Sequence, residues 1–288
     1  MSRATANGIG IEYEISGSGP PLLLIMGLGG QLCDWHPGFV EGLEQHFSVI
    51  RFDNRDSGLT TYADAPLPSK WQVVKASVFP SRSSAPYQLT TMADDAAGLL
   101  DAIGIESAHV AGMSMGGMIA QRLTIQHPNK VASLCSIMSN TGDRRHGRPT
   151  PKVLAAMARR GRPERSEVVD VTVEFFRLVG GPDWDENEQR RRTTVSTARA
   201  YNPAGVMRQT LAIAATSDRT ASLKKLTQPT LVMHGLDDPL VRPSGGRATA
   251  AAVPGSRLLL FPGMGHDLPA TRHHEMIDAI ERNTRRTA

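Results

Sequence analysis

This 288-residue chain lacks the long apolar run of a membrane-spanning protein. A helix that crosses a bilayer needs about 20 consecutive apolar residues, and no stretch approaches that length, so we expect no stable membrane insertion. The first residues also lack the basic segment and apolar core of a secretory signal, so we expect a cytoplasmic protein. The length, with 40% hydrophobic and 21% charged residues, fits one large α/β domain with a sizeable core.

Cysteine is scarce, with only Cys33 and Cys135 in the chain. No CxxC pair or Cys/His cluster surrounds either residue, which argues against a zinc site and a disulfide framework, so we expect two buried thiols. The sequence also has no phosphate-binding loop, no GxGxxG after a predicted strand and no HExxH. We therefore expect no metal and no organic cofactor.

A strong charge of one sign is missing too, since 32 basic and 28 acidic residues leave a net charge of +4. The densest basic region, residues 144–199, is interleaved with Asp and Glu, and no basic stripe carries aromatic residues between its charges. We therefore expect no nucleic acid among the partners. A small-molecule substrate remains, and the sequence carries no signal for an oligomeric state.

Short apolar runs alternate with helical patterns along most of the chain, which predicts a parallel sheet covered by helices on both faces. One of the helices is predicted to start at Thr91 as its N-cap, with Asp94 as the capping partner. Strands are predicted at 9–16, 21–27, 47–54, 107–114, 130–140, 229–235 and 256–263, and helices at 90–105, 115–127, 244–253 and 272–284.

The alternation stops at about Thr141, and residues 142–221 show only helical patterns, at 151–161, 166–180 and 187–216. An all-helical insertion within an α/β sheet is most simply a lid over the active edge. We therefore expect a core of residues 1–141 and 222–288 with a helical lid of residues 142–221.

The stretch Gly112-Met113-Ser114-Met115-Gly116 lies between a predicted buried strand and a helix that begins at once. Ser114 could be an ordinary loop serine, but this context is the one that a nucleophile elbow requires. The sharp turn needs glycine on both sides, because side chains at Gly112 and Gly116 would strike the neighbouring strand and helix.

A serine nucleophile needs a base and an acid that orients the base. Of the nine histidines, His266 follows the last predicted strand, at the edge where parallel strands end. His234 is the competitor, and we interpret it as a buried histidine satisfied by a backbone carbonyl. Asp237 and Asp238 follow the penultimate strand, so the order serine, acid, histidine is complete.

With these motifs the chain resembles the α/β-hydrolases over essentially its whole length, and among them the aclacinomycin methylesterase type and bacterial lipase-like esterases. The resemblance implies that Asp238, directly before a proline, is the acid, and that the backbone N–H groups of Leu28 and Met115 form the oxyanion hole. The matching stretches are MGLGG, FDNRDSGLTTY, GMSMGG, PTLVMHGLDDPLV and FPGMGHDLP.

One departure concerns the oxyanion loop, where many relatives have His-Gly and this chain has Met26-Gly27. Backbone donors survive a side-chain change, so the departure bears on loop geometry more than on activity. Next to this loop, Trp35 and His36 are candidates for lining the substrate pocket, and for Trp35 packing at a helix start is the alternative. In the motif FDNRDSG, Arg55 either binds a substrate anion or belongs to a turn with Asp53 and with Gly58 at positive φ.

The expected function is that of a serine hydrolase that cleaves carboxylic esters through an acyl-enzyme. The same triad could instead act on another bond, as in C–C hydrolases, lactonases and perhydrolases. A ligand-binding protein that keeps an idle triad is the alternative from another class.

Overall fold

The predicted apolar runs pair into one sheet in the computed structural model, which describes residues 2–79, 85–159, 161 and 163–287. Within these residues the sheet has eight strands in the order β1-β2-β4-β3-β5-β6-β7-β8. The strands are β1 (Ser2–Ala6), β2 (Ile9–Gly17), β3 (Pro21–Ile25), β4 (Ser48–Phe52), β5 (Ala108–Met113), β6 (Val131–Ile137), β7 (Thr230–Gly235) and β8 (Arg257–Phe261).

The sheet is antiparallel at one side and parallel across the rest. β1 pairs with β2 and β2 with β4 in antiparallel fashion, whereas each contact from β4 through β3, β5, β6 and β7 to β8 is parallel. The carboxyl ends of the parallel strands therefore meet at one edge, where α/β folds bind their ligands. The loops that follow β3, β5, β7 and β8 carry the candidate site residues.

Both faces of the sheet are buried, as the continuous apolar runs predict. On β3, Leu23 and Ile25 face one apolar cluster and Leu22 and Leu24 face the other, because successive side chains of a strand point to opposite faces. The first cluster includes residues of α3 (Leu89–Ala102), α4 (Met115–Gln126) and α10 (Ser244–Ala252), and the second includes residues of α1 (Pro37–Glu44) and α11 (His273–Thr284).

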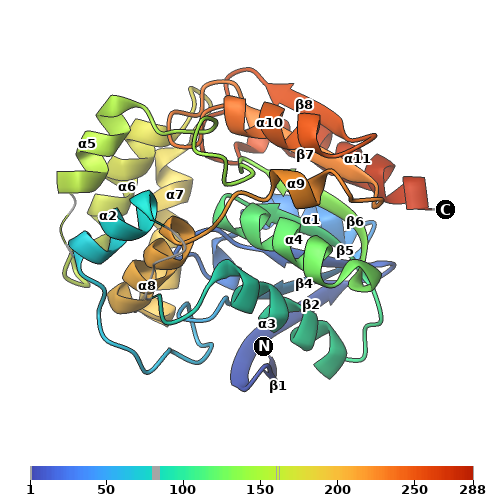
Figure 1. The fold of residues 1–288 in the computed structure, drawn as a ribbon, viewed down its shortest axis with the longest axis horizontal. Helices are drawn as coiled ribbons and strands as arrows, with labels where there is room; N and C mark the ends of the chain where they lie inside the picture. Colours follow the sequence, from blue (N-terminus) through green and yellow to red (C-terminus); the bar gives the residue numbers. More distant parts are fainter. Residues whose placement is uncertain (1, 80–84, 160, 162, 288) are drawn as a thin grey trace.

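Residues 142–221, called the insertion below, lie between β6 and β7; their long helices gather at one end of the molecule, whereas the last residues begin a short helix beside α4 (Figure 1). Asn202 caps the last long helix of the insertion, so the single helical run predicted over 187–216 is two helices. Helix α2 (Lys70–Val78), which the sequence analysis missed, packs against α8. The helices of the insertion are α5 (Pro151–Arg159), α6 (Val168–Val179), α7 (Glu186–Arg199), α8 (Pro203–Ala214) and α9 (Thr220–Leu223).

Two local predictions are wrong. Helix α3 begins at Leu89 with Gln88 as its N-cap, and the Thr91 hydroxyl accepts from the Gln88 N–H, so Thr91 lies in the first turn and is not the cap. Cys33 is partly exposed, whereas Cys135 is buried as expected. Within the described part of the chain, no helix combines the length and the apolar character needed to cross a bilayer.

Candidate active site

Ser114 lies on a tight turn between β5 and α4. Its φ of 57° and ψ of −119° fall in a region that costs a non-glycine residue roughly 1–3 kcal/mol. The surrounding backbone holds this conformation, because Ser114 donates its N–H to the Ile137 carbonyl at 2.8 Å and accepts at its own carbonyl from Gly117 N and Ser139 Oγ. The side chain is thereby presented at the carboxyl end of the sheet.

The glycines beside Ser114 confirm the predicted steric requirement. A Cβ on Gly112 would lie 2.2 Å from the carbonyl oxygen of Gly116, in helix α4. A Cβ on Gly116 would lie 1.9 Å from the carbonyl oxygen of Ile25, at the end of β3. Both contacts are with backbone atoms, so no side-chain movement relieves them.

His266 lies within hydrogen-bonding distance of both Ser114 and Asp238, although the three residues are far apart in the sequence. His266 Nε2 is 2.9 Å from Ser114 Oγ, and His266 Nδ1 is 2.7 Å from Asp238 Oδ2. His266 and Asp238 are both buried, while Ser114 is partly exposed. A hydroxyl, an imidazole and a carboxylate in this order match the geometry of a serine-hydrolase triad.

Asp238 is held as a carboxylate. Its Oδ1 accepts from the backbone N–H groups of Leu240 and Val241, both at 2.9 Å. Burial alone would raise the pKa of Asp238, but the charge of His266 and the hydrogen bonds from His234 and His266 outweigh it and lower the pKa to about 2. The carboxyl group is therefore ionised at neutral pH.

His234 and Asp237 take supporting positions beside these residues. His234 is fully buried and its Nε2 is 2.6 Å from the Val241 carbonyl oxygen, which confirms the interpretation of a buried histidine satisfied by the backbone. Asp237 Oδ2 accepts from Gly263 N at 2.8 Å, so it ties the loop after β7 to the turn that precedes His266.

The loop after β3 runs beside Ser114. A Cβ on Gly27 would lie 3.3 Å from Ser114 Cβ, and Asn54 Nδ2 donates to the Met26 carbonyl at 2.9 Å. Met26 is buried and fills the inside of the loop, where a Cβ on Gly30 would meet its Cγ at 2.5 Å. The methionine thus supports the loop from within by packing.

Three polar side chains that the sequence analysis missed connect this loop to the insertion. Gln209 of α8 accepts from Gly29 N at 2.8 Å, and its amide group donates to the Arg55 carbonyl. Arg199 of α7 donates to Gln31 Oε1 at 2.8 Å. Gln31 in turn donates to the carbonyls of Ser196 and Ala200. Residues some 170 positions apart carry no local pattern that would have indicated these contacts.

Arg199 also donates to Asp53 at 2.7 Å, and the other oxygen of Asp53 accepts from Leu32 N. Helix α7 and the loop after β3 therefore both donate to the buried carboxylate of Asp53, which fixes their relative position.

The loop of His266 is also attached to the insertion. His266 N donates to the Val179 carbonyl at 2.7 Å, at the end of α6, and Gly181 N donates to Asp267 Oδ1 at 2.9 Å. A Cβ on Gly265 would lie 2.4 Å from Gly181 N, so the two segments touch along their backbones. The insertion thus contacts both the candidate base and the candidate oxyanion loop.

Trp35 takes the packing position that the sequence left as its alternative, and His36 caps a helix, a role that the sequence did not indicate. Trp35 is 1% exposed and stacks on Phe39 within the core. His36 caps α1 by accepting from Gly38 N at its Nδ1. Neither contact is made with the residues around Ser114.

The segment FDNRDSG forms the turn allowed by the sequence, with Gly58 at a φ of 55° and Asp53 accepting from Leu59 N. Contrary to the expectation from the sequence, Arg55 does not contribute to this turn. It forms a two-pronged ion pair with Asp95 at 2.5 Å on each arm, which occupies its guanidinium group.

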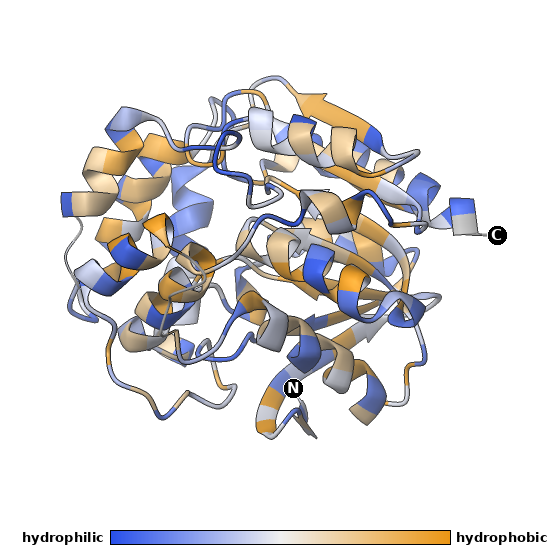
Figure 2. Cartoon of the chain, in the orientation of Figure 1, coloured by the Kyte–Doolittle hydropathy of each residue, from blue (hydrophilic) through white to orange (hydrophobic). Residues whose placement is uncertain are grey.

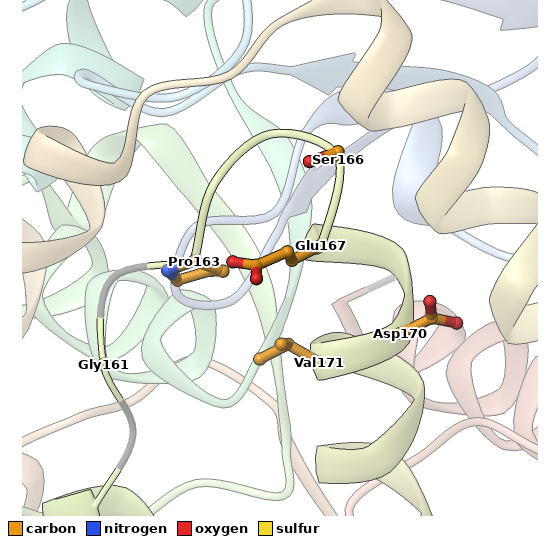
Figure 3. Close-up of a pocket in the computed structure, with 6 residues that line it drawn as sticks. All are labelled: Gly161, Pro163, Ser166, Glu167, Asp170 and Val171. Carbon is orange, nitrogen blue, oxygen red and sulfur yellow. The ribbon is translucent and has the colours of Figure 1, made fainter.

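A hollow of about 450 Å³ lies on the insertion, outside the candidate site (Figure 3). Its lining is mainly the start of α6 and the segment before it, and it includes two carboxylates. The lining residues are Gly161, Pro163, Ser166, Glu167, Asp170 and Val171.

Comparison with known proteins agrees with this architecture. The model of a family described as the alpha/beta hydrolase fold matches residues 20–272. Rhodomycin D methylesterase DauP of Streptomyces sp. (strain C5) is 30% identical over 92% of this chain and 91% of its own length.

Two solved structures share the fold. The esterase RhEst1 from Rhodococcus sp. ECU1013 has a TM-score of 0.75 and 19% identity, over 100% of this chain and 99% of the other. The meta-cleavage product hydrolase CumD from Pseudomonas fluorescens IP01 has a TM-score of 0.74 and 18% identity, over 100% and 98%. With the family model matching most of its length, the chain belongs to the alpha/beta hydrolase fold family.

Proposed function

We propose that this protein is a serine hydrolase that cleaves carboxylic esters of small molecules. The observation that carries the proposal is the continuous contact from Ser114 Oγ through His266 to the ionised Asp238, on a strained turn at the carboxyl edge of the sheet. The similarity to a rhodomycin D methylesterase supports an ester as the bond that is cleaved.

In the proposed mechanism, Ser114 Oγ attacks the ester carbonyl carbon while His266 Nε2 takes the hydroxyl proton. The backbone N–H groups of Leu28 and Met115 hold the negative oxygen. Because Met115 is the first residue of α4, the positive end of the helix dipole also stabilises this charge. His266 then gives the proton to the departing alcohol. Water, activated by the same imidazole, releases the acid from the acyl-enzyme, and Asp238 orients His266 throughout.

The insertion, residues 142–221, serves in this proposal as the lid over a core of residues 1–141 and 222–288. Its support is the position of α6, α7 and α8, which contact the loops of His266 and of Leu28. Side chains on the inner surface of these helices would then select the substrate.

The decisive experiment compares the protein with Ser114→Ala. The variant is expected to lose at least about 10⁴-fold in kcat for p-nitrophenyl esters and all labelling by a fluorophosphonate, because the Ser114 hydroxyl is the one that His266 Nε2 contacts among the described residues. Ser256→Ala is the matched control, since the Ser256 hydroxyl bonds the Ala250 carbonyl at the far edge of the sheet. Unchanged labelling of Ser114→Ala would rule out the assigned nucleophile.

A series of p-nitrophenyl esters of rising chain length separates the proposed activity from its alternatives. An esterase should turn over at least one ester rapidly, whereas a C–C hydrolase should be slow even with the shortest. Slow turnover of every ester together with thermal stabilisation by a ligand would indicate a binding protein.

A further inference from the structure

The outer face of α2 is apolar, although it is turned to solvent. Trp71, Val74 and Val78 follow one another at the spacing of a single helix face, and Leu67 extends the stripe before the helix begins. Trp71 is 81% exposed and Val74 51% exposed. Ordinary surface helices place such side chains inward, so this stripe needs an explanation.

The inner face of the same helix already packs against α8. Val73 and Ala76 pack with Leu211 and Ala214 of α8 in a cluster of their own. Trp71, Val74 and Val78 therefore stay outside after the helix has docked. Rotating the helix to bury them would expose Val73 and Ala76.

Helix α5 adds apolar side chains alongside, because α2 and the segment containing α5 run in opposite directions. Lys70 Nζ donates to the Ala158 carbonyl at 3.3 Å, and Arg144 donates to the Val78 carbonyl at 2.9 Å. On α5, Leu154 and Met157 are exposed one turn apart. Both helices lie at the outer end of the molecule, and each shows hydrophobic colour there (Figure 2).

Basic residues predominate in this region. Residues 65–79 and 144–159 carry lysines and arginines and contain no Asp or Glu, although Asp64 and Asp143 directly precede them and Asp143 pairs with Arg145. Within the described residues, Lys75, Lys152 and Arg159 form no ion pair. We call this surface the basic apolar face, comprising Leu67, Lys70, Trp71, Val74, Lys75, Val78, Leu154 and Met157.

We propose that the basic apolar face docks the protein on the surface of an anionic phospholipid bilayer. Trp71 and the other apolar side chains would enter the acyl-chain boundary of the bilayer, and the cations beside them would meet the negative head groups. A second copy of this chain fits less well, because a two-fold contact would bring the cations of one copy against the same cations of the other. The docking does not depend on the triad.

Vesicle binding tests the proposal with two compositions, phosphatidylcholine alone and an equal mixture with phosphatidylglycerol. The protein should sediment with the mixed vesicles and be released by high salt, because cation attraction is screened. The variant Lys75→Gln should bind roughly fivefold more weakly, because it removes one cation that attracts the anionic head groups. Lys224→Gln, which removes an exposed lysine of the α9 region, should bind as the unchanged protein does.

A matched pair of substitutions tests the apolar part. Val74→Asp should abolish sedimentation with the mixed vesicles, whereas Val195→Asp should leave it intact, since Val195 is equally exposed at 50% but lies on α7. Unfolding temperatures equal to that of the unchanged protein will show that both variants keep the fold. We expect this result because both positions are on the surface.

Tryptophan emission shows whether the face itself enters the lipid. Of the three tryptophans, Trp71 is the exposed one, while Trp35 is buried and Trp184 partly so. Mixed vesicles should shift the tryptophan emission to the blue, and brominated acyl chains should quench it. The variant Trp71→Phe should lose both effects but should still sediment with the mixed vesicles. Equal binding to both vesicle types, absence of binding, or a dimer in solution that Val74→Asp converts to a monomer would overturn the proposal.

Discussion

Two adjacent aspartates, Asp237 and Asp238, illustrate how position decides the role of a side chain. Both follow β7, but only Asp238 is buried and faces His266, where backbone N–H groups and imidazole hydrogen bonds keep it ionised. Asp237 points to the turn at Gly263. The sequence alone offers both carboxylates, and only the resemblance to a family separated them.

Asp238→Asn is expected to lower kcat by about 10⁴-fold, because an amide in place of the carboxylate no longer stabilises the imidazolium or its correct tautomer. Asp237→Asn should change kcat little, since its amide oxygen still accepts from Gly263 N. Steady-state kinetics with one p-nitrophenyl ester measure both. Equal losses in the two variants would contradict the assignment of Asp238.

His273 makes the stability of the fold depend on pH. Burial lowers its pKa to about 4, the nearby charges of His36 and Arg192 add to the shift, and the hydrogen bond to the Leu268 carbonyl opposes it. The unfolded state, in which histidine has a pKa of about 6.5, therefore binds more protons between those two values. The free energy of unfolding should fall as pH drops from about 6.5 to about 4.

Denaturant unfolding at a series of pH values measures this slope, which is at most about 1.4 kcal/mol per pH unit for one proton. His273→Gln should reduce the slope in that window, whereas His274→Gln should not, because His274 is exposed. An identical slope in both variants would assign the acid sensitivity to other groups.

The insertion helices act at the scale of elements by fixing the two loops that flank Ser114. Helix α8 reaches Gly29 through Gln209, α7 reaches Gln31 and Asp53 through Arg199, and the end of α6 accepts from the backbone of His266. Residue 26 is a methionine and not the histidine of many relatives. The loop therefore depends on these contacts for its position. In the proposed mechanism the insertion would therefore position the loop of Leu28 as well as cover the site.

Gln209→Leu is expected to lower kcat by up to about 100-fold with little change in KM, because a shift of the loop moves the Leu28 N–H away from the developing oxyanion. Gln209→Glu keeps an acceptor for Gly29 N and should retain more activity than the leucine variant. Thr210→Ala is the control, since the Thr210 hydroxyl bonds only the Val206 carbonyl of its own helix. A rise in KM alone would contradict a role in loop geometry.

Sequence patterns predicted most of the elements whose apolar side faces the core. The parallel strands and helices α3, α4, α10 and α11 have that property, and their predicted ranges agree with the structure to within a few residues. Helix α1 also packs its apolar residues into the core but was not among the predicted helices. Strand β1 was missed because it is a mostly exposed edge without apolar alternation. Helix α2 was missed because most of its large apolar residues face outward, which hides the usual pattern.

The residues of the candidate site also divide into those that the sequence revealed and those that it did not. Ser114, His266 and the two aspartates follow strands, so local motifs reveal them. Gln209 and Arg199 lie on helices of the insertion and contact residues over 140 positions away, and no local signal marks them. Long-range polar contacts of this kind require coordinates.

The whole molecule is joined by buried ion pairs between the core and the insertion. Asp56 forms a two-pronged pair with Arg208 of α8 at 2.7 and 2.8 Å and also accepts from the Tyr87 hydroxyl. Burial alone would raise the pKa of Asp56, but these hydrogen bonds lower it. Core and insertion should therefore unfold together, as a single cooperative transition.

Calorimetry should show one transition, and Asp56→Asn should destabilise it by about 3 kcal/mol, because Arg208 is left buried without a counter-charge. Asn tolerates the positive φ of 69° at this position, so backbone strain is not the cause. Asp170→Asn, which removes a largely exposed pair with Arg190, should cost less than about 1 kcal/mol. Two separate transitions in the unchanged protein would show that the insertion unfolds on its own.

The contacts from the insertion to Asp53, Asp56 and Gly29 also limit how the protein can be re-engineered. A chimera that receives the insertion of a relative would exchange Arg199, Arg208 and Gln209 while keeping the carboxylates and the backbone group that they meet. Such a graft should therefore work only when the segments around residues 26–32 and 53–63 are transferred with it. Under the proposed function, substrate range and turnover would then depend on the same set of contacts and change together in a graft.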